Sequence, residues 1–365
     1  MSQQEPEPVR RSIEVEYWVV DDEGRLVEPD DLVELPGAER EFVEPLVEVK
    51  TTPCETTAAL REELFERVAR VVRAADERGM ALVPLATPVN QETIAERESD
   101  RGRIQNAVVG EDFEYVRHCA GTHVHVEQEP GREIDQLNAL TALDPALALV
   151  NSSPYFRGER LAAGARSKLY RWMAYDEVPH QGRLWPYADD TDEWTRRLER
   201  RYEEFLTAAA EAGADRRAVQ ANFDPESAVW TPVQLREEFG TVEWRSPDAA
   251  LPSQVVDLAD SVAGVVERVP DSEVRIEGTT GRVTDEAVVL PEFDAVVGYV
   301  DAAIRRGLDS TAVREYLDRM GFDVDAYEPT TAELAGQGTV DESRAREIRL
   351  DAAERLRRDV LRRRA

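Results

Sequence analysis

Four short segments of the chain alternate polar and apolar side chains, and this alternation restricts the possible folds most strongly. The segments are residues 12–20, 42–51, 121–128 and 241–245. A period of two is typical of strands that have one face against a core and the other face turned away from it. Helical patterns separate the segments, without the rhythm of a βαβ repeat. We therefore expect an α+β fold built on an antiparallel sheet.

The segments between these strands have the spacing of amphipathic helices, in which apolar residues recur every three or four positions. One of them contains Pro145, which we expect to interrupt its helix. The predicted helices are residues 56–78, 134–151, 194–212 and 255–269, and a further strand is predicted at residues 81–85.

The chain is expected to form one main body with a short arm. We expect residues 1–10 to be a flexible arm, residues 11–270 to be the core, and residues 271–365 to add a C-terminal hairpin and helices packed on the same domain. The hairpin is predicted at residues 274–290, with its turn at Thr280-Gly281. The last helix is rich in arginine, which complements its own dipole and an acidic body.

The balance of charge excludes several partners. The chain carries 45 Lys and Arg against 75 Asp and Glu, a net charge of −30. Such a surface repels nucleic acids and anionic membranes, so neither is expected as a partner. Lys50 and Lys168 are its only lysines. This composition is typical of a salt-accumulating halophile, and a GC-rich genome is the alternative explanation.

Other familiar signals are absent from the sequence. Cys54 and Cys119 are too few for a disulfide scaffold. The first residues lack an apolar signal-peptide core, and the best apolar run, residues 137–150, is too short to span a bilayer. We therefore expect a cytoplasmic protein. No P-loop, Rossmann, zinc-ribbon or nucleophile-elbow motif occurs.

Each of the four alternating segments places two polar side chains on one face of its strand. A half-exposed strand explains any one pair, although two of the only four histidines stand in one pair. If the strands join one sheet, the pairs converge, and close carboxylates need a cation to neutralise them. Carboxylates with imidazoles suit Mg²⁺ or Mn²⁺, with nucleotide phosphate as a further oxygen donor. The pairs are Glu14 and Glu16, Glu44 and Glu48, His123 and His125, and Glu243 and Arg245.

A cluster of cationic side chains follows the turn at residues 151–155. Arginine binds phosphate and carboxylate through its planar fork, so the cluster indicates anion capture. Local ion pairing with the acidic surface is the alternative. The members are Arg157, Arg160, Arg166, Lys168 and Arg171.

The string Phe239-Gly240-Thr241-Val242-Glu243-x-Arg245 resembles the F/H-G-T-V-E-x-R signature of the glutamate–cysteine ligase type 2 family, which are carboxylate–amine ligases. Four other blocks resemble the family's motifs in the same order, so the resemblance extends over residues 12–250 and is only loose in the C-terminal third. These blocks are residues 13–16, 47–54, 123–126 and 153–158.

The resemblance implies a curved antiparallel β-sheet with helices packed outside it, as in glutamine synthetase. It also implies an ATP-dependent ligase that phosphorylates a γ-carboxylate and lets an amine attack the acyl phosphate, with ATP and Mg²⁺ (or Mn²⁺) as cofactors. Arg245 would hold the transferring phosphate, and Arg166 a phosphate or a substrate carboxylate. Arg157, Arg160 and Lys168 would bind nucleotide. The implied metal ligands and their close neighbours are Glu14, Glu16, Glu48, His123, His125 and Glu243.

The sequence departs from the family pattern in its substrate turns. Ser12 replaces the opening glycine, Ala86-Thr87-Pro88 replaces a G-T-H-P turn, and Glu159 with Arg160 replaces an Asp-Thr pair. ATP and metal chemistry are therefore better supported than glutamate or cysteine as substrates. The alternatives are a non-catalytic relative that binds a nucleotide or amino acid, and a metal-dependent hydrolase, for which the sequence offers few further histidines. The expected partners are small amino-acid substrates, and a homo-oligomer is possible.

Overall fold

The computed structural model describes residues 9–175, 178, 180–334, 336 and 338–361. Its centre is a seven-stranded antiparallel sheet in the order β2-β3-β1-β5-β9-β8, with β4 paired to the second half of β1. The strands are β1 (Arg11–Asp21), β2 (Ala38–Arg40), β3 (Leu46–Lys50), β4 (Met80–Val83), β5 (Thr122–Glu127), β8 (Val233–Arg236) and β9 (Thr241–Trp244).

All four strands predicted from alternation lie in this sheet, as the neighbours β3, β1, β5 and β9. The strand predicted at residues 42–51 is shorter than expected. It begins at Leu46 because Pro45 has no N–H for the ladder, and the N–H of Glu44 bonds instead to the carbonyl of Ala95. The α+β fold class with an antiparallel sheet is confirmed.

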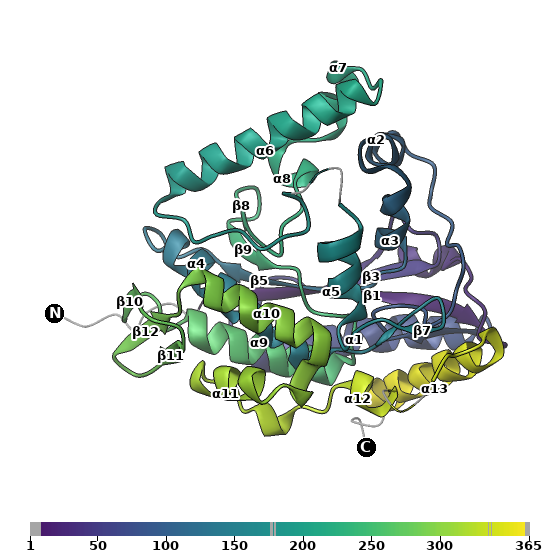
Figure 1. Cartoon of the computed structure of the whole chain (residues 1–365). Coiled ribbons are helices and arrows are strands. Elements are labelled where there is room, and N and C mark those ends of the chain that lie inside the picture. The colour runs from purple at the N-terminus through teal and green to yellow at the C-terminus, as the bar shows by residue number, and fades with distance from the viewer. Residues whose placement is uncertain (1–8, 176–177, 179, 335, 337, 362–365) are drawn as a thin grey trace.

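One face of the sheet is apolar and carries the core. Val15, Val49, Val124 and Val242 alternate with the polar residues of their strands, and none of them is exposed. Helices pack on this face, so its side chains are removed from water (Figure 1). These helices are α1 (Thr57–Asp76), α4 (Glu133–Leu143), α9 (Pro252–Val266) and α13 (Glu342–Leu361).

Helices also stand over the opposite, polar face (Figure 1). A pocket lies between the strands and these helices. They are α2 (Asp100–Val109), α3 (Phe113–Arg117), α6 (Thr191–Glu211) and α8 (Pro225–Ala228). The remaining elements are η1 (Asp30–Glu34), η2 (Gly110–Asp112), β6 (Tyr155–Phe156), β7 (Glu159–Arg160), α5 (Ala165–Lys168), the π-helical η4 (Leu169–Met173), α7 (Arg216–Asn222), α10 (Phe293–Arg306), η5 (Gly307–Asp309), α11 (Thr311–Arg319), η6 (Val324–Ala326) and α12 (Thr330–Leu334).

The helix predicted at residues 134–151 is interrupted as expected. The α-helix α4 ends at Leu143, and a 3₁₀ helix, η3 (Asp144–Val150), follows with Pro145 in its first turn. Proline lacks the N–H that would continue the α-helical hydrogen bonds. The change of direction buries the carboxylate of Asp144, which pairs with Arg171 at 2.6 Å.

The C-terminal hairpin was predicted wrongly. The residue range contains a three-stranded sheet in which β10 pairs in parallel with β12, and only β11 and β12 are antiparallel. The turn lies at Thr284, whose hydroxyl accepts the N–H of Ala287, and not at Thr280-Gly281. The side-chain hydrogen bond to the backbone fixes the later turn. The strands are β10 (Glu273–Ile276), β11 (Arg282–Val283) and β12 (Ala287–Leu290).

The chain ends are held against the body where they are described. Residues 1–8 of the predicted arm lie outside the described residues, but Val9 packs into the core and Arg10 pairs with Glu127. At the other end, Arg357 of α13 pairs with Asp76 of α1 at 3.0 Å. Residues 362–365, with their three arginines, lie outside the described part. The division of the chain at residue 270 stays a prediction.

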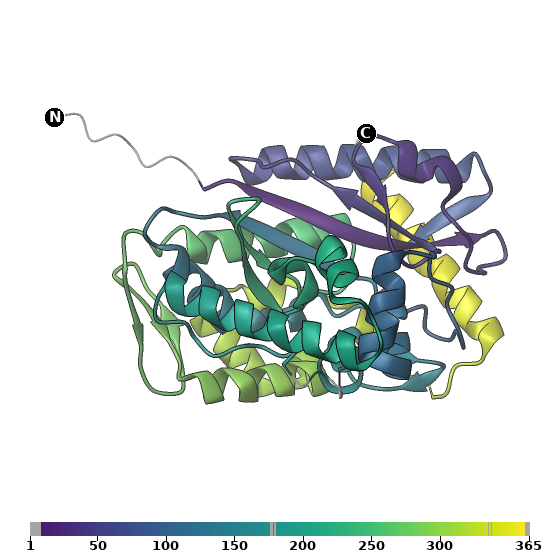
Figure 2. The same ribbon diagram turned by 90° about the horizontal axis from the view of Figure 1, so that it is seen from above.

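The helix α13 lies against β4 and α1 (Figure 2). Its Arg349 is buried, and the guanidinium donates to the backbone carbonyls of Gly24, Pro88 and Asn90. The three carbonyls come from loops in the first quarter of the sequence. Helix α13 therefore holds these early loops in place through one side chain. No helix within the described ranges is both long and apolar enough to cross a membrane.

Candidate active site

The polar face of the sheet brings together side chains from neighbouring strands, and the strand register decides which ones meet. Glu14 on β1 lies opposite Lys50 on β3 and opposite His123 on β5. One step along, Glu16 lies opposite Glu48. Directly opposed residues of an antiparallel pair have Cβ atoms about 5 Å apart, so these side chains share one surface. The convergence predicted from the sequence is confirmed.

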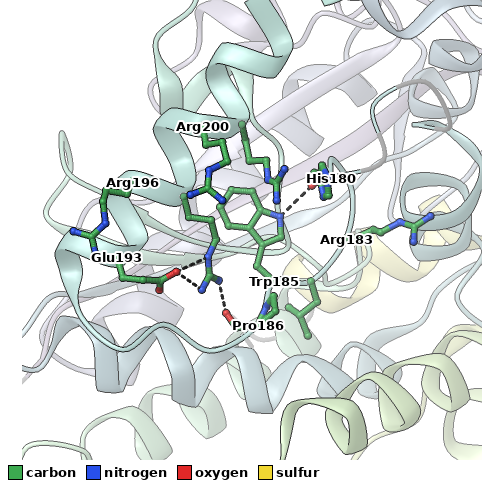
Figure 3. A pocket seen from close by; sticks show the side chains of 10 residues that line it. His180, Arg183, Trp185, Pro186, Glu193, Arg196 and Arg200 are labelled. Atoms are coloured by element: carbon green, nitrogen blue, oxygen red, sulfur yellow. Dashed lines mark hydrogen bonds and ion pairs between the residues drawn. The ribbon is translucent and has the colours of Figure 1, made fainter.

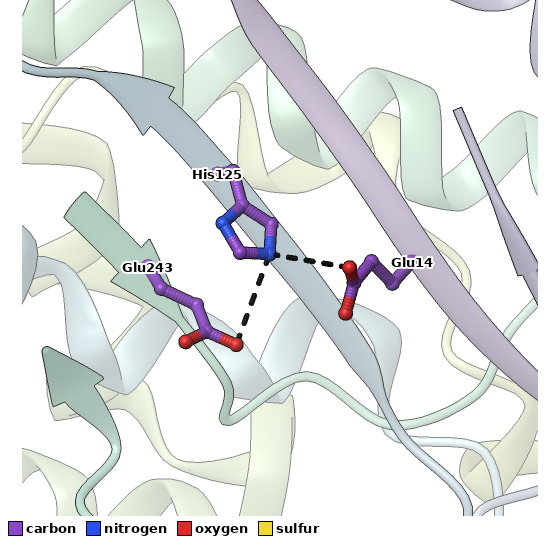
Figure 4. A group of neighbouring side chains, drawn as sticks. All are labelled: Glu14, His125 and Glu243. Atoms are coloured by element: carbon purple, nitrogen blue, oxygen red, sulfur yellow. Dashed lines mark ion pairs between the residues drawn. The ribbon is translucent and has the colours of Figure 1, made fainter. Parts of the chain in front are cut away.

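The first group of possible metal ligands is Glu14, His125 and Glu243 (Figure 4), whose ligand atoms all lie within 4.8 Å of one another. The Nε2 atom of His125 lies 3.8 Å from an oxygen of each carboxylate. The side chain of His125 is buried, its Nδ1 contacts the Thr241 hydroxyl at 3.1 Å, and its Nε2 has no hydrogen-bond partner in the described part of the chain. A buried nitrogen of this kind is open to a ligand.

Two more groups continue across the sheet, Glu14 with Glu48 and His123, and Glu16 with Glu41 and Glu48. Carboxylate oxygens with imidazole nitrogens are a donor set that Mg²⁺ or Mn²⁺ accepts, so these residues fit a divalent ion. Glu41, directly after β2, was not predicted. Glu44 was expected beside Glu48, but it precedes the strand and does not line this pocket.

Neighbouring charges set the protonation of the first group. Burial alone would raise the pKa of Glu243, but Arg245 and the two histidines outweigh burial and lower this pKa to about 2. Burial likewise opposes ionisation of Glu14, and the neighbouring imidazoles of His123 and His125 reverse the effect, so the pKa of Glu14 is lowered. Both carboxylates are therefore ionised and available as ligands at neutral pH.

The carboxyl groups of Glu41 and Glu48, at the other end of the pocket, have raised pKa values instead of lowered ones. Burial, followed by repulsion from Glu16, raises the pKa of Glu41 to about 8. Burial and the neighbouring Glu41 and Glu14 raise the pKa of Glu48 well above its usual value. In the absence of a divalent ion, Glu41 therefore holds a proton near neutral pH.

The pocket above these carboxylates has a volume of about 410 Å³ and also has a cationic side and an aromatic side. Arg236 on β8 contacts Glu243 at 2.7 Å, and the Nε of Arg245 lies 3.2 Å from the same carboxylate. The guanidinium of Arg245 lies 5.5 Å from the ring centre of Trp230, which stacks on Tyr170 at 4.4 Å. Sequence reasoning missed Arg236, although the alternation in residues 233–236 places it on the polar face.

Comparison with known proteins shows which family the chain belongs to. Residues 10–352 match the family described as glutamate-cysteine ligase family 2 (GCS2). The chain belongs to this family. A glutamate–cysteine ligase of Haloferax volcanii is 28% identical over 351 residues, which cover 85% of this chain and 86% of that protein. A putative glutamate–cysteine ligase 2 of Thermobifida fusca is 27% identical over 269 residues, 69% of this chain and 61% of that protein.

The fold is also found in a solved structure. A bifunctional glutathione synthetase from Pasteurella multocida superposes with a TM-score of 0.54 at 12% identity, covering 98% of this chain and 53% of that one. The chain therefore spans about half the length of that protein and less than two thirds of the Thermobifida relative. The likeness at this identity concerns the fold alone.

The family resemblance gave Arg166 a place at the phosphate or substrate, but the structure puts it behind the pocket. Its side chain is buried, and its Nη1 donates to the backbone carbonyls of Arg245 and Ser246 at 3.1 Å each. Its guanidinium also lies 5.1 Å from the ring centre of Tyr170. Arg166 therefore positions the end of β9, and Arg245 with it, instead of lining the pocket.

Three residues assigned to nucleotide by the family resemblance do not line the pocket either. Arg157 pairs with Glu114, and Arg160 is exposed on β7. Lys168 donates to the carbonyl of Leu161 at 3.2 Å. The contact of Arg157 fits the alternative of local ion pairing, and the nucleotide role of the three residues stays a prediction.

Proposed function

We propose that the chain is an ATP-dependent carboxylate–amine ligase of the glutamate–cysteine ligase type, which forms a γ-glutamyl-type amide through an acyl phosphate. The single observation that carries the proposal is the meeting of three carboxylate and imidazole groups with Arg236 and Arg245 on one polar sheet face. Membership of the family supports a ligase with small-molecule substrates.

In this proposal Glu14, His125 and Glu243 hold one Mg²⁺ or Mn²⁺, and the carboxylates of Glu16 and Glu48 belong to a second group of donors. A bound divalent ion would neutralise the negative charge that builds up during phosphoryl transfer. Arg236 keeps Glu243 ionised and oriented by holding its second oxygen. The first donor group is therefore formed before any ligand arrives.

Arg245 is the group proposed to bind the transferring phosphoryl group. No hydrogen bond in the described part of the chain uses its guanidinium, although the Nε faces Glu243. Trp230 packs against the flat face of the guanidinium, which fixes its plane while leaving its edge for phosphate oxygens. The stacked rings of Trp230 and Tyr170 also form a wall that keeps water from an acyl phosphate.

The direct test is release of ADP and phosphate from ATP with pairs of amino acids, in high KCl with Mg²⁺. We expect release that requires both a carboxylate and an amine acceptor, and that is lost in Glu243→Gln. A non-catalytic relative would bind ATP without releasing phosphate. A metal-dependent hydrolase would convert its substrate without ATP, so the three functions give different results.

A further inference from the structure

A second pocket lies on the outer side of α6, between the first turns of this helix and residues 180–186 (Figure 3). Its volume is about 330 Å³, within the range of small-molecule sites, and it shares no lining residue with the carboxylate pocket. Five arginines and one glutamate line it in a chain of net charge −30. The arginines are Arg183, Arg196, Arg197, Arg200 and Arg201.

Two of these arginines are already neutralised. Arg197 contacts Glu193 at 2.6 Å, and Arg201 contacts Glu204 at 2.6 Å. Arg197 also donates to the carbonyls of Pro186 and Tyr187, so it ties the loop to the helix and fixes the pocket wall. The indole N–H of Trp185 donates to the carbonyl of His180 (Figure 3). The ring of Trp185 also packs on Trp194. These contacts fix the walls of the pocket without involving the side chains of the other three arginines.

The guanidiniums of Arg183, Arg196 and Arg200 form no hydrogen bond or ion pair with any described residue. Unpaired guanidiniums around one concave surface repel one another, and an anion relieves that repulsion. Guanidinium forks bind carboxylate and phosphate oxygens in pairs. We propose that this pocket binds a small oxyanion with two or more negative charges, such as a metabolite that carries phosphate or carboxylate groups.

The test is calorimetric titration of the full chain with pyrophosphate and, separately, with citrate at fixed ionic strength. EDTA keeps divalent ions out of the acidic pocket, whose carboxylates then repel either anion. We expect one anion to bind per chain, and Arg196→Gln with Arg200→Gln to weaken binding at least tenfold. The two titrants distinguish a phosphate ligand from a carboxylate ligand. Glutamine keeps the helix propensity of these exposed sites.

The matched control is Arg217→Gln with Arg282→Gln, which removes two exposed arginines elsewhere. The control should bind the anion as the wild type does. The proposal is overturned if neither anion binds, if the pocket variant binds like the wild type, or if both double variants weaken binding equally. The last result would show that only the net charge of the chain matters.

A second inference concerns Lys50, one of only two lysines beside 43 arginines. Strand geometry places it two residues after Glu48 and opposite Glu14, on the polar face. Its Nζ lies 2.9 Å from Glu48, 3.1 Å from Glu39 and 3.5 Å from Glu14. The ammonium group of lysine is a compact point charge that can lie among these carboxylates. The wider guanidinium of arginine would not concentrate its charge at one point there.

The geometry points to Lys50 as a built-in cation that occupies the position between Glu14 and Glu48 and keeps a divalent ion out of their group with His123. This inference rests on the proposed metal function of the pocket. It makes Lys50 a positioning residue, because it fixes how many divalent ions the face accepts.

The test counts bound Mn²⁺ by equilibrium dialysis and by its paramagnetic resonance signal. Lys50→Met should bind one more Mn²⁺ per chain than the wild type, while Lys168→Met, at the other lysine, should match the wild type. Equal numbers in Lys50→Met and wild type would overturn the role of Lys50. A wild type that binds no Mn²⁺ would instead count against the metal function, and the two failures are therefore distinguishable. Circular dichroism confirms that each variant is folded.

Discussion

Arg245 is the residue on which phosphoryl transfer depends most directly in the proposed function. We expect Arg245→Lys to lower kcat at least a hundredfold, because lysine loses both the paired contact with phosphate and the stacking on Trp230. The fold should lose less than about 1 kcal/mol, since β9 is held by Arg166 through backbone carbonyls. Steady-state kinetics beside thermal denaturation checks both parts. Wild-type turnover in the variant would reject the role.

Glu41 is expected to make the stability of the metal-free protein fall as the pH rises. Its pKa is raised to about 8 in the fold, so between its ordinary value and pH 8 the folded state holds a proton that the unfolded state has lost. Stability contributed by this proton is therefore lost as the pH rises through that window. Glu41→Gln mimics the protonated acid, so its advantage in thermal midpoint over the wild type should grow from pH 5 to pH 8 in EDTA.

The same comparison with Mg²⁺ present tests the physical cause. A divalent ion at the carboxylates takes the place of the proton, so the wild type should regain stability at pH 8 and the advantage of Glu41→Gln should shrink. An advantage that stays constant across the pH range would show that Glu41 does not titrate as its surroundings imply.

Among the elements, the strands were the most predictable part. Alternation alone placed β1, β3, β5 and β9, and the shared polar face followed from the period of two. The same reasoning could not place Arg166. Its position in sequence resembled a ligand-binding residue, while its contacts are with the backbone just after β9, 79 and 80 positions away. Local patterns carry no information about partners at that separation.

Glu41 and the turn at Thr284 show the other limit. Glu41 lies outside any regular strand, so no periodicity assigns it to a face. The turn between β11 and β12 is held by the hydroxyl and the backbone N–H of Thr284, which both bond to Ala287. The sequence pattern alone did not favour this turn over one at Thr280-Gly281. The metal-ligand face and Arg245 could therefore be predicted, while the aromatic side of the pocket, Trp230 and Tyr170, depended on tertiary packing.

The loop before β5 contains a testable contact between elements. A Cβ at Gly121 would collide with the guanidinium of Arg166, which is buried and held on β9. We expect Gly121→Ala to destabilise the fold by about 1–3 kcal/mol, as overpacking does, and to lower activity by displacing Arg245. Urea denaturation measures the loss. Gly298→Ala, in α10 where a Cβ meets nothing within 4 Å, is the control and should be neutral or stabilising.

For the whole molecule, charge is the dominant feature. At a net charge of −30 the folded state repels itself, and salt screens that repulsion over about 3 Å at 1 M ionic strength. We expect the thermal midpoint to rise steeply between 0.1 and 2 M KCl. Each kcal/mol of added stability raises the midpoint of a small domain by ~4–8 °C, and that of a chain of this size by less. A flat response would mean that the scarcity of lysine reflects genome composition.

Divalent ions separate general screening from the proposed site. Millimolar Mg²⁺ should raise the midpoint more than KCl of equal ionic strength, because bound metal stabilises by mass action. The excess should vanish in a Glu16→Gln, Glu243→Gln double variant. If it persists there, Mg²⁺ acts on the acidic surface as a whole and the site loses its thermodynamic support.

The clamp formed by Arg349 has a consequence for the way the chain is made. Its guanidinium holds the carbonyl of Gly24, 325 positions earlier, together with those of Pro88 and Asn90. During translation the first strands leave the ribosome long before α13 exists. The loops that carry these carbonyls must therefore wait, without this contact, until Arg349 itself has been made. Termination before Arg349 would leave a product in which this side chain never holds those loops.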